Sequence, residues 1–439
     1  MRPSRIAASA ALALSSPAIA MAGAPEDFAG RYIAAISDGD MRAYAYIDGV
    51  LGPDRGPDEL AIVDLSADAT PTARIEAPNT VINPVYSIAA TPDGNTVFIA
   101  ETVEGRGPDA TMLSDLASGR MLRAYDLSNP AAPRLVDEVE VGHRPLGVSV
   151  SPDGRTLVLA TKTSGDPLAF VTWGADGFGP VRRFALEGVS AMPELPDQGL
   201  LPHHAEWHPE RDLVAVTFAL RNQVRFYAVT RGEDGAVTAI EQQGNAVTTT
   251  KWPMSGKFSR DGRFFVSNDL KWGPDVAGFY LNAPGSTLTS IRLGDPAQDS
   301  PRHIIVGGAP LPRHAESMAF SNAGDLIATL NIGQTWLAPS EPGHSLSSLS
   351  LLAFDAETGL LRRLGDWAME GILPEGVAFD AADNWVVTGI YEYEGPEPRA
   401  SGLEFWRVHR VPGEAPMLVS SPHRVETGPG AHSLIVVNQ

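Results

Sequence analysis

The chain has 439 residues, no cysteine and a formal net charge of −20. A surface this acidic repels nucleic acid and anionic lipid, so neither is an expected partner. The lack of cysteine excludes a disulfide framework, thiol catalysis and Cys-based zinc binding.

Residues 1–22 have the pattern of a secretory signal peptide. Arg2 and Arg5 precede the apolar run IAASAALALSSPAIA, which leads into small-x-small cleavage motifs ending at Ala20 and Ala22. The run is too short and wrongly flanked for a membrane span, and no later segment has about 18 apolar residues in a row. We therefore expect a periplasmic or secreted protein with no membrane insertion. Its mature part, residues 23–439, is expected to form a single domain.

Six copies of one hairpin pattern follow along the chain. They are SIAATPDGNTVFIAET from Ser87, GVSVSPDGRTLVLATK from Gly147, HAEWHPERDLVAVTFA from His204, SGKFSRDGRFFVSNDL from Ser255, SMAFSNAGDLIATLNI from Ser317 and GVAFDAADNWVVTGIY from Gly376. Each pairs a short alternating strand with a β-branched strand across a tight turn rich in Asp, Asn and Gly. Two weaker strands follow each hairpin. Four strands in every 50–60 residues or so are typical of propeller blades.

The two ends of the chain supply a further blade. HSLIVVNQ at the C-terminus has the pattern of an inner strand with nothing after it, and GRYIAAIS from Gly30 that of a second strand with nothing before it. We predict an all-β, seven-bladed propeller, closed by a C-terminal inner strand joined to N-terminal outer strands. Such closure hides both sheet edges. An eight-bladed ring and two stacked domains are the alternatives.

Propeller topology brings the starts of the first strands and the ends of the second strands to one face of the ring. Five long connections should rise over this mouth of the central channel: 38–58, 102–119, 271–287, 332–346 and 391–402. Connections of this length are usually functional in a compact domain. A loop-rimmed hollow with convergent polar groups is the expected binding site for a small-molecule substrate.

Histidines and glutamates at equivalent positions of different blades are the candidate catalytic groups. They are His204, His314, Glu316, Glu375 and His432. A histidine can activate water as a general base, and carboxylates crowded in a narrow channel raise each other's pKa. The structural alternative is that the histidines are satisfied half-buried residues and that the glutamates form salt links to Arg144 or Lys251.

The candidate ligand-binding groups ring the same mouth. They are Arg144, His203, Lys251, Asn268, Asn331 and Trp336. The cations could bind a substrate oxygen or equally neutralise the channel acids. The asparagines could bind Ca²⁺ or orient substrate, and the alternative is that they cap strand ends. Trp336 could form an apolar pocket wall or anchor its loop. Nearby, His208 is expected to cap its turn and Glu206 to point sideways from its strand.

Several signatures are missing from the sequence. It has no His-x-His pair, no His-Glu-x-x-His motif, no Asp-x-Asp-x-Asp-Gly calcium loop, and no nucleophile elbow, phosphate loop or dinucleotide fingerprint in the required context. The cofactor is therefore unassigned: none is one expectation, and a divalent metal is the alternative.

The repeats GVSVSPDGRTLVLAT, SIAATPDGNTVFIAE and SMAFSNAGDLIATLN resemble those of the YVTN-type and lactonase-like seven-bladed propellers, over nearly the whole mature chain. The lactonase-like branch includes sugar-lactone hydrolases and a muconate-cycle cycloisomerase, whose active region is a channel mouth bearing His, Glu and Arg. The resemblance implies that role for His204, His314, Glu316, Glu375, His432 and Arg144.

Two departures narrow what the resemblance implies. The signal peptide and the acidity are unlike the cytoplasmic sugar-phosphate members, so a phosphorylated substrate is not expected. A second group, the calcium-dependent gluconolactonases and paraoxonases, uses Glu, Asn and Asp at the mouth. Glu375, Asn268, Asp269 and Asn331 could imitate that set, but the flanking sequences differ.

Three functions are compatible with this pattern. The first is a periplasmic lactonase-like hydrolase or isomerase of a small oxygenated molecule, in which His204 or His432 activates water, Glu316 or Glu375 orients or re-protonates it, and Arg144 or Lys251 stabilises the oxyanion. The second is metal-dependent chemistry with the same groups. The third is a non-catalytic binding or scaffold propeller, for which a protein partner is the alternative ligand.

Overall fold

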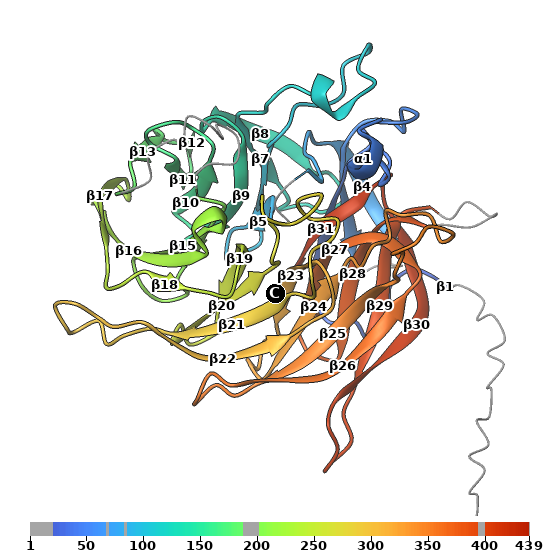
Figure 1. Cartoon of the computed structure of the whole chain (residues 1–439). Helices are drawn as coiled ribbons and strands as arrows, with labels where there is room; N and C mark the ends of the chain where they lie inside the picture. Colours follow the sequence, from blue (N-terminus) through green and yellow to red (C-terminus); the bar gives the residue numbers. More distant parts are fainter. Residues whose placement is uncertain (1–20, 67–69, 83–85, 188–201, 394–399, 439) are drawn as a thin grey trace, which may run out of the picture.

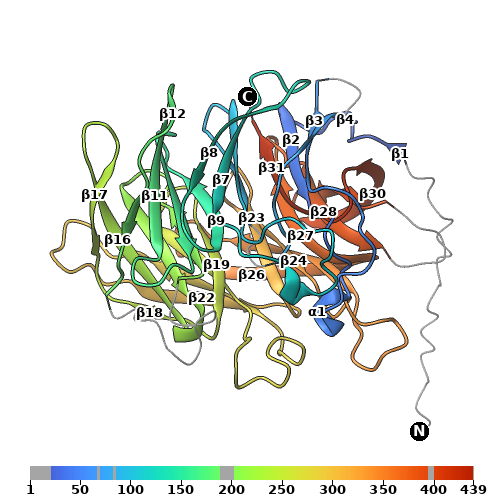
Figure 2. The same ribbon diagram turned by 90° about the horizontal axis from the view of Figure 1, so that it is seen from above.

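The computed structural model describes residues 21–66, 70–82, 86–187, 202–393 and 400–438. Within these ranges the chain forms seven sheets, which stand as blades around a central axis (Figures 1 and 2). The predicted seven-bladed, all-β propeller is confirmed. Residues 1–20 of the predicted signal peptide lie outside the described residues.

The strands follow one another from the centre of the ring outward in each blade. The first blade contains β31 (Ala431–Val437), β2 (Tyr32–Ser37), β3 (Glu59–Asp64) and β4 (Pro71–Glu76). The second contains β5 (Ile88–Ala90), β6 (Thr96–Ala100), β7 (Met121–Asp126) and β8 (Arg134–Glu140). The third contains β9 (Pro145–Val150), β10 (Thr156–Thr161), β11 (Leu168–Gly174), β12 (Gly177–Phe178) and β13 (Arg182–Phe184).

The other four blades repeat this order. The fourth contains β14 (His204–Trp207), β15 (Leu213–Phe218), β16 (Gln223–Arg231), β17 (Val237–Gln242) and β18 (Val247–Thr248). The fifth contains β19 (Pro253–Phe258), β20 (Phe264–Asp269), β21 (Thr287–Arg292) and β22 (Ile304–Pro310). The sixth contains β23 (Ala315–Phe320), β24 (Leu326–Asn331), β25 (Ser347–Phe354) and β26 (Leu361–Met369). The seventh contains β27 (Gly371–Phe379), β28 (Trp385–Tyr393), β29 (Gly402–His409), β30 (Met417–Glu426) and β1 (Met21–Ala22).

The ring closes as the sequence predicts. The inner strand β31 pairs antiparallel with β2, with Val436 opposite Ile33 and Leu434 opposite Ala35. Both termini therefore contribute to one blade, and neither end leaves the edge of an inner strand unpaired.

The core lies between blades, because the second strand of each blade is apolar on both faces. All six residues of β10, β15 and β24 are buried, whereas β8 and β22 are largely exposed at the rim. A strand covered on both sides reads as a continuous apolar run, which is what these segments show. Short helical turns are α1 (Ala45–Asp48), η1 (Leu113–Asp115) and η2 (Ala219–Arg221). Among the described residues, no helix has the length and apolar character needed to traverse a bilayer.

β-Bulges interrupt the inner strands where they reach the mouth. The pairing of β23 with β24 skips Glu316, the pairing of β31 with β2 skips His432, and the pairing of β27 with β28 skips the segment that holds Glu375. An unpaired bulge residue bends its strand and re-aims its side chain. A β-bulge therefore turns each of these three predicted catalytic side chains out of the regular pleat of its strand.

Left-handed backbone recurs at the same level of the ring. Arg144, Trp252 and His314, each just before an inner strand, have φ values of 46°, 54° and 57°, and Leu373, the third residue of β27, has a φ of 50°. Such conformations cost non-glycine residues of order 1–3 kcal/mol and cluster at functional sites. The strained backbone of this face of the ring is therefore typical of a functional site.

Candidate functional site

Loop residues pack over the mouth of the channel. The ring centroid of Tyr46, in α1, lies 6.1 Å from that of Trp336, and the Trp336 ring lies 5.5 Å from that of Tyr280. Trp336 is also 4.8 Å from the imidazole of His314. Trp336 thus belongs to a buried apolar cluster built from several mouth loops. This placement fits both a pocket wall and a loop anchor.

Two buried glutamates stand beneath these aromatic rings. Glu316 and Glu375 are 5% and 1% exposed and come from the neighbouring inner strands β23 and β27. Burial raises the pKa of Glu316 to about 8. Burial, then the charges of Glu316 and Asp38, raises the pKa of Glu375 well above its ordinary value. Oε2 of Glu375 has no hydrogen-bond partner among the described residues. The pair therefore holds a proton near neutral pH, as acid–base catalysis requires.

His314 offers a hydrogen-bond donor at the same mouth. The indole Nε1–H of Trp272 donates to Nδ1 of His314 over 2.8 Å. Burial lowers the pKa of His314 to about 3, so the ring is neutral at pH 7. Because an indole can only donate, Nδ1 carries the lone pair and Nε2 carries the proton. Nε2 is buried with no partner among the described residues, so it can donate to a ligand.

His432 is fixed in the same tautomer as His314, with its proton on Nε2. Its Nε2 lies 2.6 Å from Oδ1 of Asn79, whose Nδ2 donates to the main-chain oxygens of Ser37 and Ala77. Nε2–H of His432 is therefore the donor, and Nδ1 keeps its lone pair. Burial lowers the pKa of His432 to about 3, which makes Nδ1 a weak base.

His204 belongs to a charged group deeper in the channel. Its Nε2 lies 3.3 Å from Oε2 of Glu206, and Nζ of Lys257 lies 2.9 Å from Oε1 of the same carboxylate. The Lys257 ammonium also sits 4.1 Å from the ring centroid of Tyr86. Glu206, expected to point sideways from its strand, thus joins two neighbouring inner strands. Burial is the largest effect on the pKa of His204 and lowers it.

The Glu206–Lys257 pair yields a prediction on stability. Replacing Lys257 by methionine should lower the free energy of unfolding by roughly 1–3 kcal/mol, because it leaves a largely buried carboxylate without its cation. Adding Glu206→Gln should restore part of the loss. A thermal-unfolding double-mutant cycle measures this coupling. Strictly additive single and double variants would contradict it.

The remaining candidate ligand-binding residues are placed as follows. His203 is half-buried, and burial lowers its pKa to about 3. Nδ2 of Asn268 donates to the main-chain oxygen of Ala315 at 2.7 Å, which links the fifth blade to the sixth. Asn331 donates to Oγ of Ser350 at 2.8 Å. These contacts fit the alternative in which the two asparagines secure strand ends.

The two cations proposed as oxyanion stabilisers occupy different settings. Nζ of Lys251 lies 2.7 Å from a carboxylate oxygen of Asp275, whose side chain is 72% exposed. Lys251 thus already has a solvent-facing partner. Arg144 is half-buried at a left-handed position.

The third histidine of the His203–His208 cluster has the structural role expected for it. Nδ1 of His208 accepts the main-chain N–H groups of Glu210 and Arg211, at 3.0 and 3.1 Å. It caps the turn between β14 and β15.

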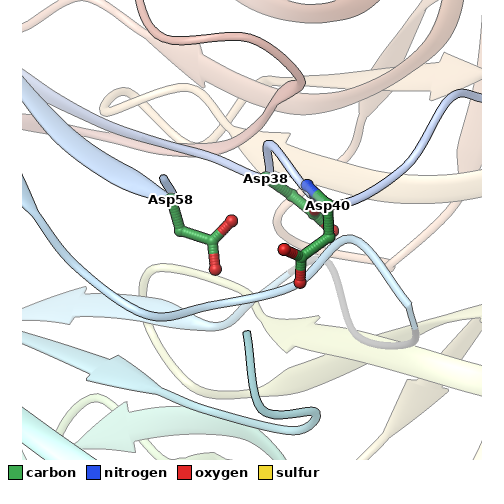
Figure 3. Close-up of side chains that lie close together, drawn as sticks. All are labelled: Asp38, Asp40 and Asp58. Atoms are coloured by element: carbon green, nitrogen blue, oxygen red, sulfur yellow. Dashed lines mark hydrogen bonds between the residues drawn. The ribbon is translucent and has the colours of Figure 1, made fainter. Parts of the chain in front are cut away.

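A trio of buried aspartates was not singled out from the sequence. Oxygen atoms of Asp38, Asp40 and Asp58 lie within 4.8 Å of one another at the base of loop 38–58 (Figure 3). The only sequence signal is the Asp-Gly-Asp spacing of the first two. Their grouping with Asp58, at the other end of the loop, depends on how the loop folds.

The buried groups at the mouth predict how stability varies with pH. The pKa values of His314 and His432, lowered to about 3, make the fold lose stability as pH falls below about 6.5. The pKa of Glu316, raised from 4.5 to about 8, makes the fold lose stability as pH rises between those values. From pH 6.5 to 8 the histidines have little effect, while the ionisation of Glu316, and of Asp40 with its pKa raised by burial to about 7, lowers the free energy of unfolding. Glu316→Gln should remove up to about 1.4 kcal/mol per pH unit of that decline. Unfolding measured at intervals over this range, in wild type and variant, checks it; identical slopes would contradict it.

Comparison with known proteins identifies the fold. No model of a known protein family matches the sequence, and no curated protein is similar to it. A Bacteroides fragilis protein provisionally described as a 6-phosphogluconolactonase is 13% identical, with a TM-score of 0.61, over 93% of this chain and 98% of that one. The periplasmic gluconolactonase of Pseudomonas aeruginosa is 16% identical, with a TM-score of 0.60, over 92% and 99%. This chain shares their fold. A protein of unknown function from Desulfotomaculum acetoxidans is 10% identical, with a TM-score of 0.59, over 93% and 99%.

Proposed function

We propose that this chain hydrolyses small, uncharged lactones at the mouth of the propeller, in the periplasm. The observation that carries the proposal is the buried pair Glu316 and Glu375 at the mouth, where His314, two residues before Glu316, has an unpartnered donor at Nε2–H. The fold shared with a protein named as a periplasmic gluconolactonase supports the substrate class and the compartment. The pattern of residues 1–22 supports the compartment as well.

Lactone hydrolysis needs three groups. Water adds to the carbonyl carbon as a base takes its proton, a donor stabilises the oxyanion, and an acid protonates the ring oxygen as the C–O bond breaks. Ionised Glu316 takes the proton from water. Protonated Glu375 gives one to the ring oxygen, and Nε2–H of His314 donates to the oxyanion.

The pKa values favour Glu316 over the histidines as the base. A general base works best when its pKa is close to the working pH. The pKa of Glu316 is about 8, whereas that of His432 is about 3. Nδ1 of His432 therefore accepts a hydrogen bond from substrate more readily than it accepts a proton. We therefore assign the base to Glu316, whereas the sequence alone suggested His204 or His432.

The charge of the site favours a neutral substrate. The chain carries a formal net charge of −20, and two glutamates and Asp38 interact at the mouth. A phosphate group would be repelled by these carboxylates unless a cation paired with it. An uncharged polyhydroxy lactone meets no such repulsion.

Turnover of a lactone panel tests the proposal. Purified protein is assayed with five- and six-membered aldonolactones and their phosphorylated forms by acid release in a pH-stat, with spontaneous hydrolysis subtracted. We expect turnover of uncharged lactones and at least tenfold lower kcat/KM for the phosphorylated forms. No turnover above background on any lactone would favour a non-catalytic binding or scaffold propeller.

A further inference from the structure

The aspartate trio lies outside the proposed acid–base groups. Asp38 follows β2, Asp40 comes two residues later, and Asp58 directly precedes β3. They are 0%, 6% and 5% exposed. Figure 3 shows the carboxylates of Asp40 and Asp58 turned toward the same space, with Asp38 next to Asp40. Three carboxylates removed from water at this spacing repel one another strongly.

In the hydrogen bonds around the trio, the aspartate carboxylates act only as acceptors. Asp38 accepts the main-chain N–H groups of Val81 and Asp40, both at 2.8 Å, and the hydroxyl of Thr80 at 3.2 Å. Asp58 accepts the N–H groups of Gly39 and Asn79, at 2.9 and 3.1 Å. Such donors stabilise the charged form of a carboxylate. A protonated carboxyl would need an acceptor instead.

Only one of the two carboxylate oxygens of Asp40 has a hydrogen-bond partner among the described residues. Its Oδ1 accepts the main-chain N–H of Arg106 at 2.9 Å. Its Oδ2 is buried with no hydrogen-bond partner among the described residues. A buried carboxylate oxygen without a partner is costly, so this atom calls for a cationic ligand.

The nearby arginines do not supply that ligand. The guanidinium of Arg55 donates to Glu392 and to main-chain oxygens of Asp38 and Met41. The guanidinium of Arg106 donates to main-chain oxygens of Asp40, Gly52 and Ala110. In the described part of the chain, no ion pair joins a basic side chain to any of the three carboxylates.

We propose that Asp38, Asp40 and Asp58 bind one divalent cation, preferentially Ca²⁺. The site offers only hard oxygen ligands, which suit Ca²⁺ and Mg²⁺ and disfavour zinc. Ligand atoms within 4.8 Å of one another fit Ca²⁺–O distances of about 2.3–2.6 Å, which allow opposite ligands to stand that far apart. Mg²⁺ demands a smaller, near-ideal octahedron.

The ion would fasten the mouth loops to the first blade. Loop 38–58 carries α1 and Tyr46, and the N–H of Arg106 brings loop 102–119 onto Asp40. Burial raises the pKa of Tyr46, and the nearby charges of Glu375 and Glu316 raise it further. Ca²⁺ therefore positions the aromatic cover of the mouth, whether or not the site beneath is a lactonase.

Calcium titration of the chelator-treated full-length protein tests the site. We expect calorimetry to show one Ca²⁺ per chain, and Tm to rise by roughly 3 °C when Ca²⁺ is present at 100 times Kd. Parallel titration with MgCl2 should show weaker binding. Asp40→Asn keeps an acceptor for the N–H of Arg106. It should weaken Ca²⁺ binding by at least about 10- to 100-fold, the loss that is typical when a residue that only supports a metal ligand is changed.

The control and a second variant separate the site from a folding defect. Asp109→Asn changes an exposed aspartate of loop 102–119 and should bind Ca²⁺ as the wild type does. Asp58→Asn serves if Asp40→Asn does not fold. The proposal fails if the wild type shows neither heat nor a Tm shift with Ca²⁺, or if both trio variants bind Ca²⁺ with unchanged affinity. If Ca²⁺ left the Tm of the wild type unchanged and Asp40→Asn raised that Tm, the trio would be a cluster of aspartates that share protons instead of binding a cation. These readouts do not involve lactone turnover, so the two proposals can fail separately.

Discussion

Replacing Glu375 by glutamine should reduce kcat/KM for lactone hydrolysis by about 100-fold or more, without destabilising the fold. The amide has nearly the shape of the carboxyl group but cannot give a proton to the departing ring oxygen. Because burial, together with the charges of Glu316 and Asp38, holds the pKa of this group high, the fold carries a penalty when it ionises. Removing that penalty should leave Tm unchanged or higher above neutral pH.

Kinetics and unfolding on the same samples separate catalysis from packing. Glu104→Gln changes an exposed glutamate of loop 102–119 and is the matched control, expected to keep wild-type turnover. Glu316→Gln should also lose turnover and should abolish the rise in rate toward pH 8 that a base with a pKa of about 8 produces. If Glu375→Gln kept at least half of the wild-type kcat/KM, the acid role assigned here would be wrong.

The fold was predictable because each blade carries its own turn chemistry. Hairpins with turns rich in Asp, Asn and Gly repeat at a nearly constant interval, and the unmatched strands at Gly30 and His432 can only pair with each other. Register within a blade follows from which residues are apolar, and that information is local. The number of blades and the closure of the ring therefore follow from the sequence.

For the candidate site, the sequence predicts which residues lie at the mouth of the channel but not which side chains contact one another. Aligning the repeats places Glu316, Glu375 and His432 at the mouth, because they occupy equivalent positions. It does not show that bulges re-aim them, or that the two glutamates share one buried environment while His204 pairs with Glu206 deeper in the channel. Those outcomes depend on side-chain direction, which a one-residue register shift reverses.

Contacts made by loops and across the ring left no pattern in the sequence. Asn79, which fixes the tautomer of His432, follows β4, and Asp58 meets Asp40 only because a loop of about 20 residues folds back on itself. Lys257 was overlooked because it sits mid-strand, at a position where three other repeats have alanine: Ala89, Ala319 and Ala378. Its meaning depends on Glu206 in the neighbouring blade.

Tyr86 connects blades that are not neighbours, so its truncation should be the most destabilising change in the channel. Its hydroxyl donates to the main-chain oxygen of Met318 at 3.1 Å and accepts the N–H of the same residue at 3.0 Å. Tyr86 lies two residues before β5 of the second blade, whereas Met318 lies in β23 of the sixth blade. The phenol ring therefore spans the central channel and holds opposite inner strands together.

Tyr86→Ala should lower the free energy of unfolding by roughly 3–5 kcal/mol, the range for removing a buried aromatic side chain. It deletes the ring that contacts His204 and Lys257 and leaves the Met318 main-chain groups without their partner. Tyr86→Phe keeps the ring and should cost only about 1–2 kcal/mol for the lost hydrogen bonds. Calorimetric unfolding of both variants beside Tyr44→Phe, whose hydroxyl contacts Glu341 at the loop surface, measures the difference. Equal Tm values for Tyr86→Ala and Tyr44→Phe would show that the contact of Tyr86 with Met318 across the channel does not stabilise the propeller. A graded loss from Tyr86→Phe to Tyr86→Ala would show that the packing and cation–π contact of the ring contribute more than its hydroxyl.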